Sequence, residues 1–276
     1  MTAPPDRAQS ERAQPERALS ERARDDRAQA DRAQAGWAHA PGRAARSIHA
    51  RAAVVAEAGP GGRTRLTTLR SAPPLTLRQT GPERVHLVST AAGPLGGDHL
   101  ELDILVTEGA TLELGSIAST LVLPGPGRSA MVVTAQVAAG GRLTFAPEPT
   151  VLAAGCDHAM TVRLALHADA SAYWREEIVF GRHGETPGRC HARFDATVDG
   201  RPLLRQEFTV GDPAVDGSPA VYGDARCVGN VLVAGPGFTH PEPGVAPGRA
   251  VLPLAGPGTL ILALAPDAVE LRRRLA

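Results

Sequence analysis

The residues best suited to acid–base chemistry are concentrated in one stretch of the chain, at Glu176, Glu177 and His183. Carboxyl groups and imidazoles are the side chains that most often transfer protons in enzymes. One hypothesis is therefore a small hydrolase or lyase that uses these three residues. Arg182 and Glu185 lie in the same stretch beside glycines, and an arginine–carboxylate pair commonly holds such a turn. We prefer a structural or partner-binding role for Glu177, Arg182 and Glu185.

Thiol and imidazole groups provide the candidate metal ligands, which are Cys156, His158 and His183. The His-x-His and His-Glu-x-x-His patterns that build tight sites are missing from the sequence. We therefore expect no tightly bound metal or cofactor. A weak or transient site at these three residues stays open, and such ligands suit nickel, copper or zinc.

Other catalytic patterns are also missing. The sequence has no Gly-x-Ser-x-Gly motif for a hydrolase nucleophile. It contains no lysine, which excludes both Schiff-base chemistry and the lysine of a nucleotide-binding P-loop. This chain is therefore not itself a P-loop nucleotidase.

The composition indicates a soluble cytoplasmic protein. The 276 residues carry a formal net charge of zero, which argues against nucleic acid or an anionic membrane as partner. We find no apolar run long enough to cross a membrane and no signal-peptide core. The 3 cysteines are widely spaced and favour reduced thiols over a disulfide framework.

The N-terminal part differs from the rest of the chain. Residues 6–35 repeat a five-residue unit of an acidic residue, Arg, Ala and two variable positions. A five-residue repeat places equivalent side chains around a helix without forming an apolar stripe. We predict a disordered low-complexity tail over 1–46 and a β-rich domain over 47–276.

Short apolar segments separated by Gly and Pro dominate from about Ser47 onward, which predicts a mainly β fold. A short C-terminal helix is expected to begin after Pro266-Asp267 and to end in three arginines. The predicted strands are 51–56, 85–89, 100–106, 111–114, 131–137, 142–145, 161–166, 172–180, 192–198, 204–210, 230–233 and 259–264.

A glycine-rich turn precedes one of the clearest strands. It contains Gly96, Gly97 and Asp98, and apolar and polar residues then alternate over 99–104, as expected for a half-buried strand. Glycines suit backbone angles that side chains forbid, and Asp often bonds nearby amides at turns.

A weak internal repeat follows this strand. Units that begin at Val106, Val137 and Leu166 share one spacing of apolar residues around a turn. Three stacked strand–turn–strand units predict layered antiparallel sheets or a solenoid-like β core.

A β-sandwich that binds a small ligand is a third functional hypothesis. Aromatic residues make up only 3% of the chain, however, so few stacking platforms are available for a sugar.

Several motifs, in order and spacing, resemble one family, the urease accessory proteins of the UreD type, also called UreH. The resemblance covers about residues 47–275. The matching motifs are Gly-Pro-Leu-Gly-Gly-Asp at 93–98, Glu-Gly-Ala-Thr-Leu at 108–112, Phe-Ala-Pro-Glu-Pro-Thr-Val-Leu at 145–152, Trp-Arg-Glu-Glu-Ile-Val-Phe-Gly-Arg at 174–182 with Gly-Glu at 184–185, and Val-Asp-Gly-Arg-Pro-Leu-Leu at 198–204.

The resemblance implies a β-rich scaffold of stacked antiparallel sheets with a few helices and no enzymatic activity. It implies binding to the urease apoprotein, to UreF and to the GTPase UreG, with nickel in transit to the urease active site. Gly96, Gly97 and Asp98 would then shape one turn at a partner surface, and Arg182 and Glu185 would fix another.

The sequence departs from the family pattern in two places. The segment 119–123 is largely apolar where members carry a polar and basic run. The spacing from Gly181-Arg182 to Gly184-Glu185 is also shorter than usual. The first change bears on a partner surface or on a polar passage for metal.

Overall fold

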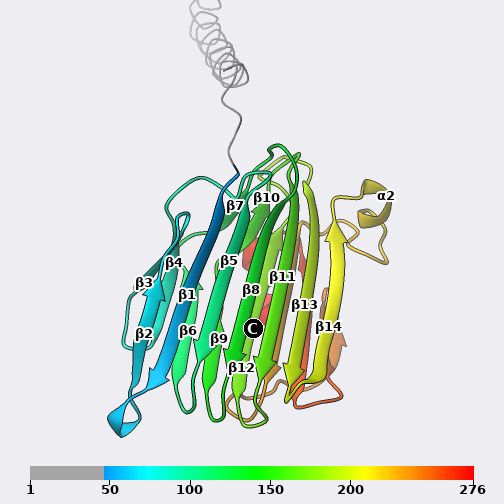
Figure 1. Cartoon of the computed structure of the whole chain (residues 1–276). Helices are drawn as coiled ribbons and strands as arrows, with labels where there is room; N and C mark the ends of the chain where they lie inside the picture. Colours follow the sequence, from blue (N-terminus) through cyan, green and yellow to red (C-terminus); the bar gives the residue numbers. More distant parts are fainter. Residues whose placement is uncertain (1–46) are drawn as a thin grey trace, which may run out of the picture. The chain divides into compact units, whose positions relative to one another are not determined.

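Two β-sheets, stacked face to face, dominate the computed structural model, which describes residues 47–276 (Figure 1). The tail predicted over 1–46 lies outside the described residues. One seven-stranded sheet, here sheet A, has the order β14 (Arg201–Val210), β13 (Arg189–Val198), β11 (Asp157–Leu166), β8 (Ser129–Val137), β5 (His99–Val106), β1 (His49–Ala58) and β2 (Thr64–Arg70).

The second sheet, here sheet B, has eleven strands. Its main path is β16 (Gly244–Ala246), β17 (Arg249–Pro253), β18 (Gly258–Ala265), β15 (Cys227–Ala234), β12 (Ser171–Val179), β9 (Arg142–Phe145), β6 (Thr111–Ser116), β4 (Arg84–Ser89) and β3 (Leu75–Gln79). The short strands β10 (Thr150–Leu152) and β7 (Thr120–Val122) complete it beside β12.

The chain coils between the two sheets, so that β5, β8 and β11 of sheet A each lead to a strand of sheet B. The weak sequence repeat corresponds to successive turns of this coil, because the first residues of its units are strand partners: Val106 pairs with Val137, and Val137 pairs with Leu166. Gly109 and Gly140 make the first two turns with φ angles of 66° and 62°, which favour glycine. The solenoid-like alternative is confirmed.

Strand direction differs from the prediction in the middle of the fold. Each unit crosses from one sheet to the other instead of folding back as a hairpin, so neighbouring units run parallel. Antiparallel pairs lie toward the ends of the sheets, as at β1–β2, β13–β14 and β15–β18. The antiparallel stacking expected for the centre of the fold is therefore corrected to parallel.

The core lies between the sheets and is centred on Trp174, which is fully buried on β12. Its ring stacks on that of Phe145 with centroids 4.0 Å apart and also meets Phe194 from sheet A. The apolar segment 119–123 contributes β7, whose Val122 is fully buried, so this departure from the family pattern supplies core packing.

The predicted C-terminal helix is present, and it covers the outer face of sheet B. Helix α3 (Ala268–Leu275) begins after Asp267, whose Oδ1 accepts a 2.8 Å hydrogen bond from the Glu270 amide. Leu271 and Leu275 are buried against β15 and β18. A short helix α2 (Pro213–Asp216) and a 3-10 turn η1 (Pro60–Gly62) lie in connections. Within the described range, no helix combines the length and apolar character needed to cross a membrane.

Every predicted strand overlaps an observed one. The sequence prediction missed β2, β3, β7, β10, β16 and β17. Most of these are short or are rich in exposed residues, so they lack the apolar alternation that marks a half-buried strand.

Candidate functional site

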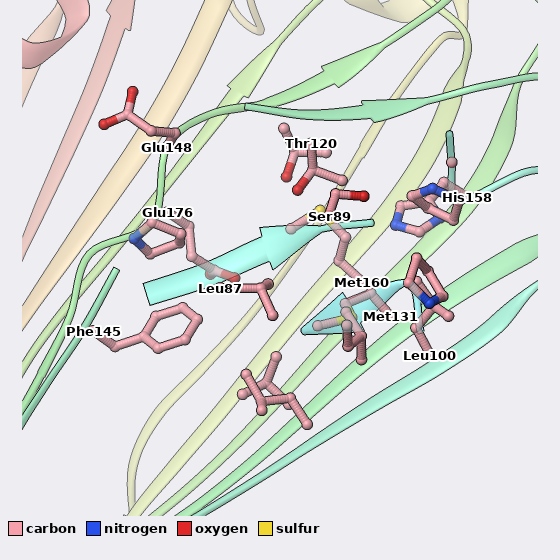
Figure 2. A pocket seen from close by; sticks show the side chains of 18 of the residues that line it. Leu87, Ser89, Leu100, Thr120, Met131, Phe145, Glu148, His158, Met160 and Glu176 are labelled. Carbon is pink, nitrogen blue, oxygen red and sulfur yellow. The ribbon is translucent and has the colours of Figure 1, made fainter. Parts of the chain in front are cut away.

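A cavity of about 90 Å³ lies between the two sheets and is the main candidate for a functional site (Figure 2). Its wall is largely apolar, with His158 from sheet A and Glu176 from sheet B among its few polar groups. Met131 and Met160 add two thioethers to the same wall. The wall reaches the surface at Glu148, whose side chain is partly exposed. The lining therefore extends from buried thioethers and an imidazole to a carboxylate that is partly exposed to solvent.

Glu176 is on the interior face of β12, where side chains alternate between the core and the outer face of the sheet. Burial raises the pKa of its carboxyl to about 7, and Asn230 and Trp174 act in the opposite direction. Near neutral pH this interior carboxyl is therefore poised between its neutral and charged forms.

The raised pKa of Glu176 predicts that the stability of the protein falls as the pH rises from about 4.5 to about 7. A folded-state pKa of about 7 lies above the ordinary value of 4.5, so the folded protein holds this proton more tightly than the unfolded chain. The contribution is fully present below pH 4.5 and is lost as the pH rises through 7, by up to about 3 kcal/mol.

Urea unfolding between pH 5 and pH 8.5 measures this effect as the difference between the wild type and Glu176→Gln. The variant cannot ionise at this position, so its free energy of unfolding should fall less over that range. Parallel pH profiles for the two proteins would contradict the assignment.

His158 is buried on β11 and opens onto the same cavity. Its Nδ1 lies 2.8 Å from the Ser129 hydroxyl, and burial lowers the pKa of the ring to about 4. The imidazole is therefore neutral at physiological pH and keeps a lone pair, which is the form that binds metal ions.

The other two metal candidates lie elsewhere. Cys156 is buried in a separate apolar cluster with Cys190, and burial raises the pKa of its thiol to about 11. His183 is exposed in the loop after β12. Over residues 47–276, no three His, Cys, Asp or Glu side chains are arranged to hold a metal ion. Cys156, His158 and His183 thus do not form one site.

The hydrolase hypothesis fails on the same geometry. Both Glu176 and Glu177 border the cavity, but the carboxylate of Glu177 is held by Arg272 of helix α3, on the side of sheet B away from the interior. His183 is exposed beyond the end of the strand. The three groups therefore do not converge on a substrate position, and this alternative is wrong.

Glu177 instead anchors a network of charged side chains. Its side chain is 0% exposed and accepts hydrogen bonds from Arg272 of α3 at 3.1–3.2 Å, with Arg175 3.3 Å away. Arg272 also donates to Glu148 at 2.7 Å. The sequence prediction identified Glu177 but missed Arg272, which it placed only among the three arginines at the end of the C-terminal helix. Nothing in the spacing of residues 95 positions apart indicates this contact.

Asp98 connects two strands of sheet A at the glycine turn. The residue is 3% exposed, and its carboxylate accepts 2.8 Å hydrogen bonds from the amides of Ile48 and Leu95. It therefore fixes the start of β1 against the turn that precedes β5.

Two glycines of this turn lie in close backbone contact with another loop. A Cβ added to Gly96 would lie 2.5 Å from the backbone carbon of Gly125, and one added to Gly97 would lie 3.0 Å from the Pro126 oxygen. Gly97 also has a φ angle of 92°. The turn is therefore built by backbone-to-backbone packing that side chains would prevent.

Arg182 and Glu185 form the ion pair predicted from their sequence context. Glu185 also accepts hydrogen bonds from the amides of Arg182 and Ala154, and its backbone oxygen accepts one from Arg226 at 2.7 Å. The hydrogen bond from Arg182 is the main cause that lowers the pKa of Glu185 to about 2. The pair therefore closes the loop after β12.

Comparison with known proteins identifies the family. The family model described as UreD urease accessory protein matches residues 49–275. A protein of Frankia casuarinae named urease accessory protein UreD is 43% identical over 281 residues, which cover 83% of this chain and 88% of the relative. A protein of the same name from Streptomyces coelicolor is 41% identical over 242 residues, covering 84% and 95%. The chain therefore belongs to the UreD family of urease accessory proteins.

Proposed function

We propose that this protein is a non-catalytic scaffold that assists nickel insertion into the urease active site. The observation that carries the proposal is the family match over residues 49–275, which spans nearly the whole described fold. The partners in this proposal are the urease apoprotein, UreF and UreG, and the compartment is the cytoplasm.

The interior cavity supports a role in handling the metal as cargo. Neutral His158, the thioethers of Met131 and Met160 and the carboxyl of Glu176 line one space. Imidazole binds nickel well, whereas a set that does not converge binds it weakly. Weak binding suits a protein that must release the ion to a partner.

Co-expression tests the scaffold role directly. The tagged protein is produced with UreF, UreG and urease subunits from the same source and is recovered after a salt wash. We expect UreF and apo-urease to be retained, and urease activity to depend on this chain. Recovery of the protein alone, together with full maturation of urease in its absence, would contradict the proposal.

A pair of interior variants tests the role of the cavity separately. His158→Gln and Glu176→Gln should lower the nickel content of urease several-fold while UreF is still retained, because both residues face the interior. His183→Gln is the matched control, since that side chain is exposed away from the cavity. Unchanged nickel content in both interior variants would remove the cavity from the mechanism.

A further inference from the structure

Two histidines lie side by side on the outer face of sheet A, apart from the interior cavity. His49 of β1 and His99 of β5 are direct partners in the parallel register. Their rings are stacked with centroids 5.8 Å apart and planes inclined by 27°. His49 is exposed, and the His99 side chain is 39% exposed. The pair is therefore accessible to an ion from solvent.

The glycine turn fixes this juxtaposition. The Asp98 carboxylate holds the Ile48 amide at 2.8 Å, and the His99 amide donates to the Ile48 oxygen, also at 2.8 Å. These two hydrogen bonds tie Ile48, which precedes His49, to Asp98 and His99 on the neighbouring strand. The two histidines are therefore held side by side. In-register strands lie about 4.8 Å apart, which brings one nitrogen of each ring within reach of a common ion after a side-chain rotation.

A chain of charged side chains orients the second ring. Nε2 of His99 lies 3.1 Å from Glu101 Oε1, and a carboxylate can only accept this hydrogen bond, so Nε2 carries the hydrogen and donates it. Glu101 lies 3.5 Å from Arg51, which in turn bonds Asp103 at 2.5 Å. In this tautomer, Nδ1 of His99 carries the free lone pair. A carboxylate that receives the other N–H is the usual support of a metal-binding histidine.

We propose that His49 and His99 bind one divalent cation of the nickel, zinc or copper class. Nδ1 of His99 and one ring nitrogen of His49 are the protein ligands, and water or a partner's side chain fills the remaining positions. Imidazole nitrogens select these metals over magnesium or calcium. Glu101 positions the His99 ring and is not a ligand. The site therefore has two protein ligands, since no three His, Cys, Asp or Glu side chains within residues 47–276 are arranged to hold a metal ion. The proposal does not rest on the function proposed above.

Calorimetric titration of the full chain with Ni²⁺ tests the site, using protein purified through a tag without histidines. We expect His49→Ala and His99→Ala each to remove one binding event per chain or to weaken it by roughly tenfold or more. Glu101→Gln keeps both ligands but loses the orienting carboxylate, so it should weaken the same event by about 10–100-fold.

His191→Ala is the matched control. His191 is also on the outer face of sheet A and bonds a carboxylate, Glu207, at 2.7 Å, but no second histidine is its register partner. This variant should titrate like the wild type. Circular dichroism shows whether each variant is folded. Folded His49→Ala and His99→Ala proteins that bind Ni²⁺ with unchanged number and affinity would overturn the proposal, as would an equal loss in His191→Ala.

Discussion

Replacing Gly96 by alanine is expected to lower the free energy of unfolding by about 4 kcal/mol or more, although it adds a single methyl group. The added Cβ would lie 2.5 Å from the Gly125 backbone carbon and 2.6 Å from its oxygen. Backbone atoms cannot move aside like the end of a flexible side chain. The turn that leads into β5 would therefore separate from the facing loop.

Urea unfolding measures this loss, and the partner glycine checks its cause. A Cβ on Gly125 would meet the Gly96 amide nitrogen at 2.7 Å, so Gly125→Ala should cost a comparable amount. Gly244 has no atom within 4 Å of an added Cβ and is the control, for which we expect a change within about 0.5 kcal/mol. A Gly96→Ala protein as stable as Gly244→Ala would show that the two loops are not in contact.

The loss of stability in Gly96→Ala also concerns the proposed metal site, because the glycine turn holds His49 and His99 side by side. Asp98 ties the turn to the start of β1. Partial separation of the loops should therefore weaken Ni²⁺ binding at His49 and His99 before the protein unfolds globally.

The coil could be predicted from the sequence because equivalent residues of successive repeat units are also strand-pairing partners. Leu112 pairs with Leu143, and Leu143 pairs with Ala172, at the spacing of the weak repeat. Strand direction could not be predicted, because the same apolar spacing suits a hairpin within one sheet and a crossing between two. What decides between them is whether the second strand pairs with its own unit or with the next one.

The candidate site was predicted less completely than the fold. Motifs drew attention to Glu176 and Glu177, but only the alternation of β12 assigns them to opposite faces of the sheet. The cavity needs His158 and Glu176 from different sheets, and the outer histidine pair needs strands 50 residues apart. Contacts of this range depend on sheet order, which local patterns do not specify.

Replacing Glu177 by alanine should destabilise the protein by about 3 kcal/mol, because one buried carboxylate holds two arginines. Arg175 and Arg272 are 20% and 38% exposed, so water compensates part of the loss. The hydrogen bond with Glu177 is the main cause that raises the pKa of Arg272, which shows how closely the pair is coupled. Helix α3 should therefore loosen from sheet B in this variant.

A double-mutant cycle separates this coupling from the loss of packing. Glu177→Gln keeps the shape of the Glu177 side chain, and Arg272→Met removes the positive charge of Arg272. If the ion pair carries the effect, the double variant should lose clearly less stability than the sum of the two single losses. Glu113→Gln, which removes the carboxylate from an ion pair with Arg84 exposed on both sides, is the control and should change stability far less. Strictly additive losses at Glu177 and Arg272 would mean that other contacts hold the helix, such as the packing of Leu271 and Leu275 and the hydrogen bonds from Arg249 to the Arg274 and Ala276 oxygens. Positive coupling would instead assign the position of the C-terminal helix to a charge network whose second carboxylate, Glu148, lies at the mouth of the interior cavity.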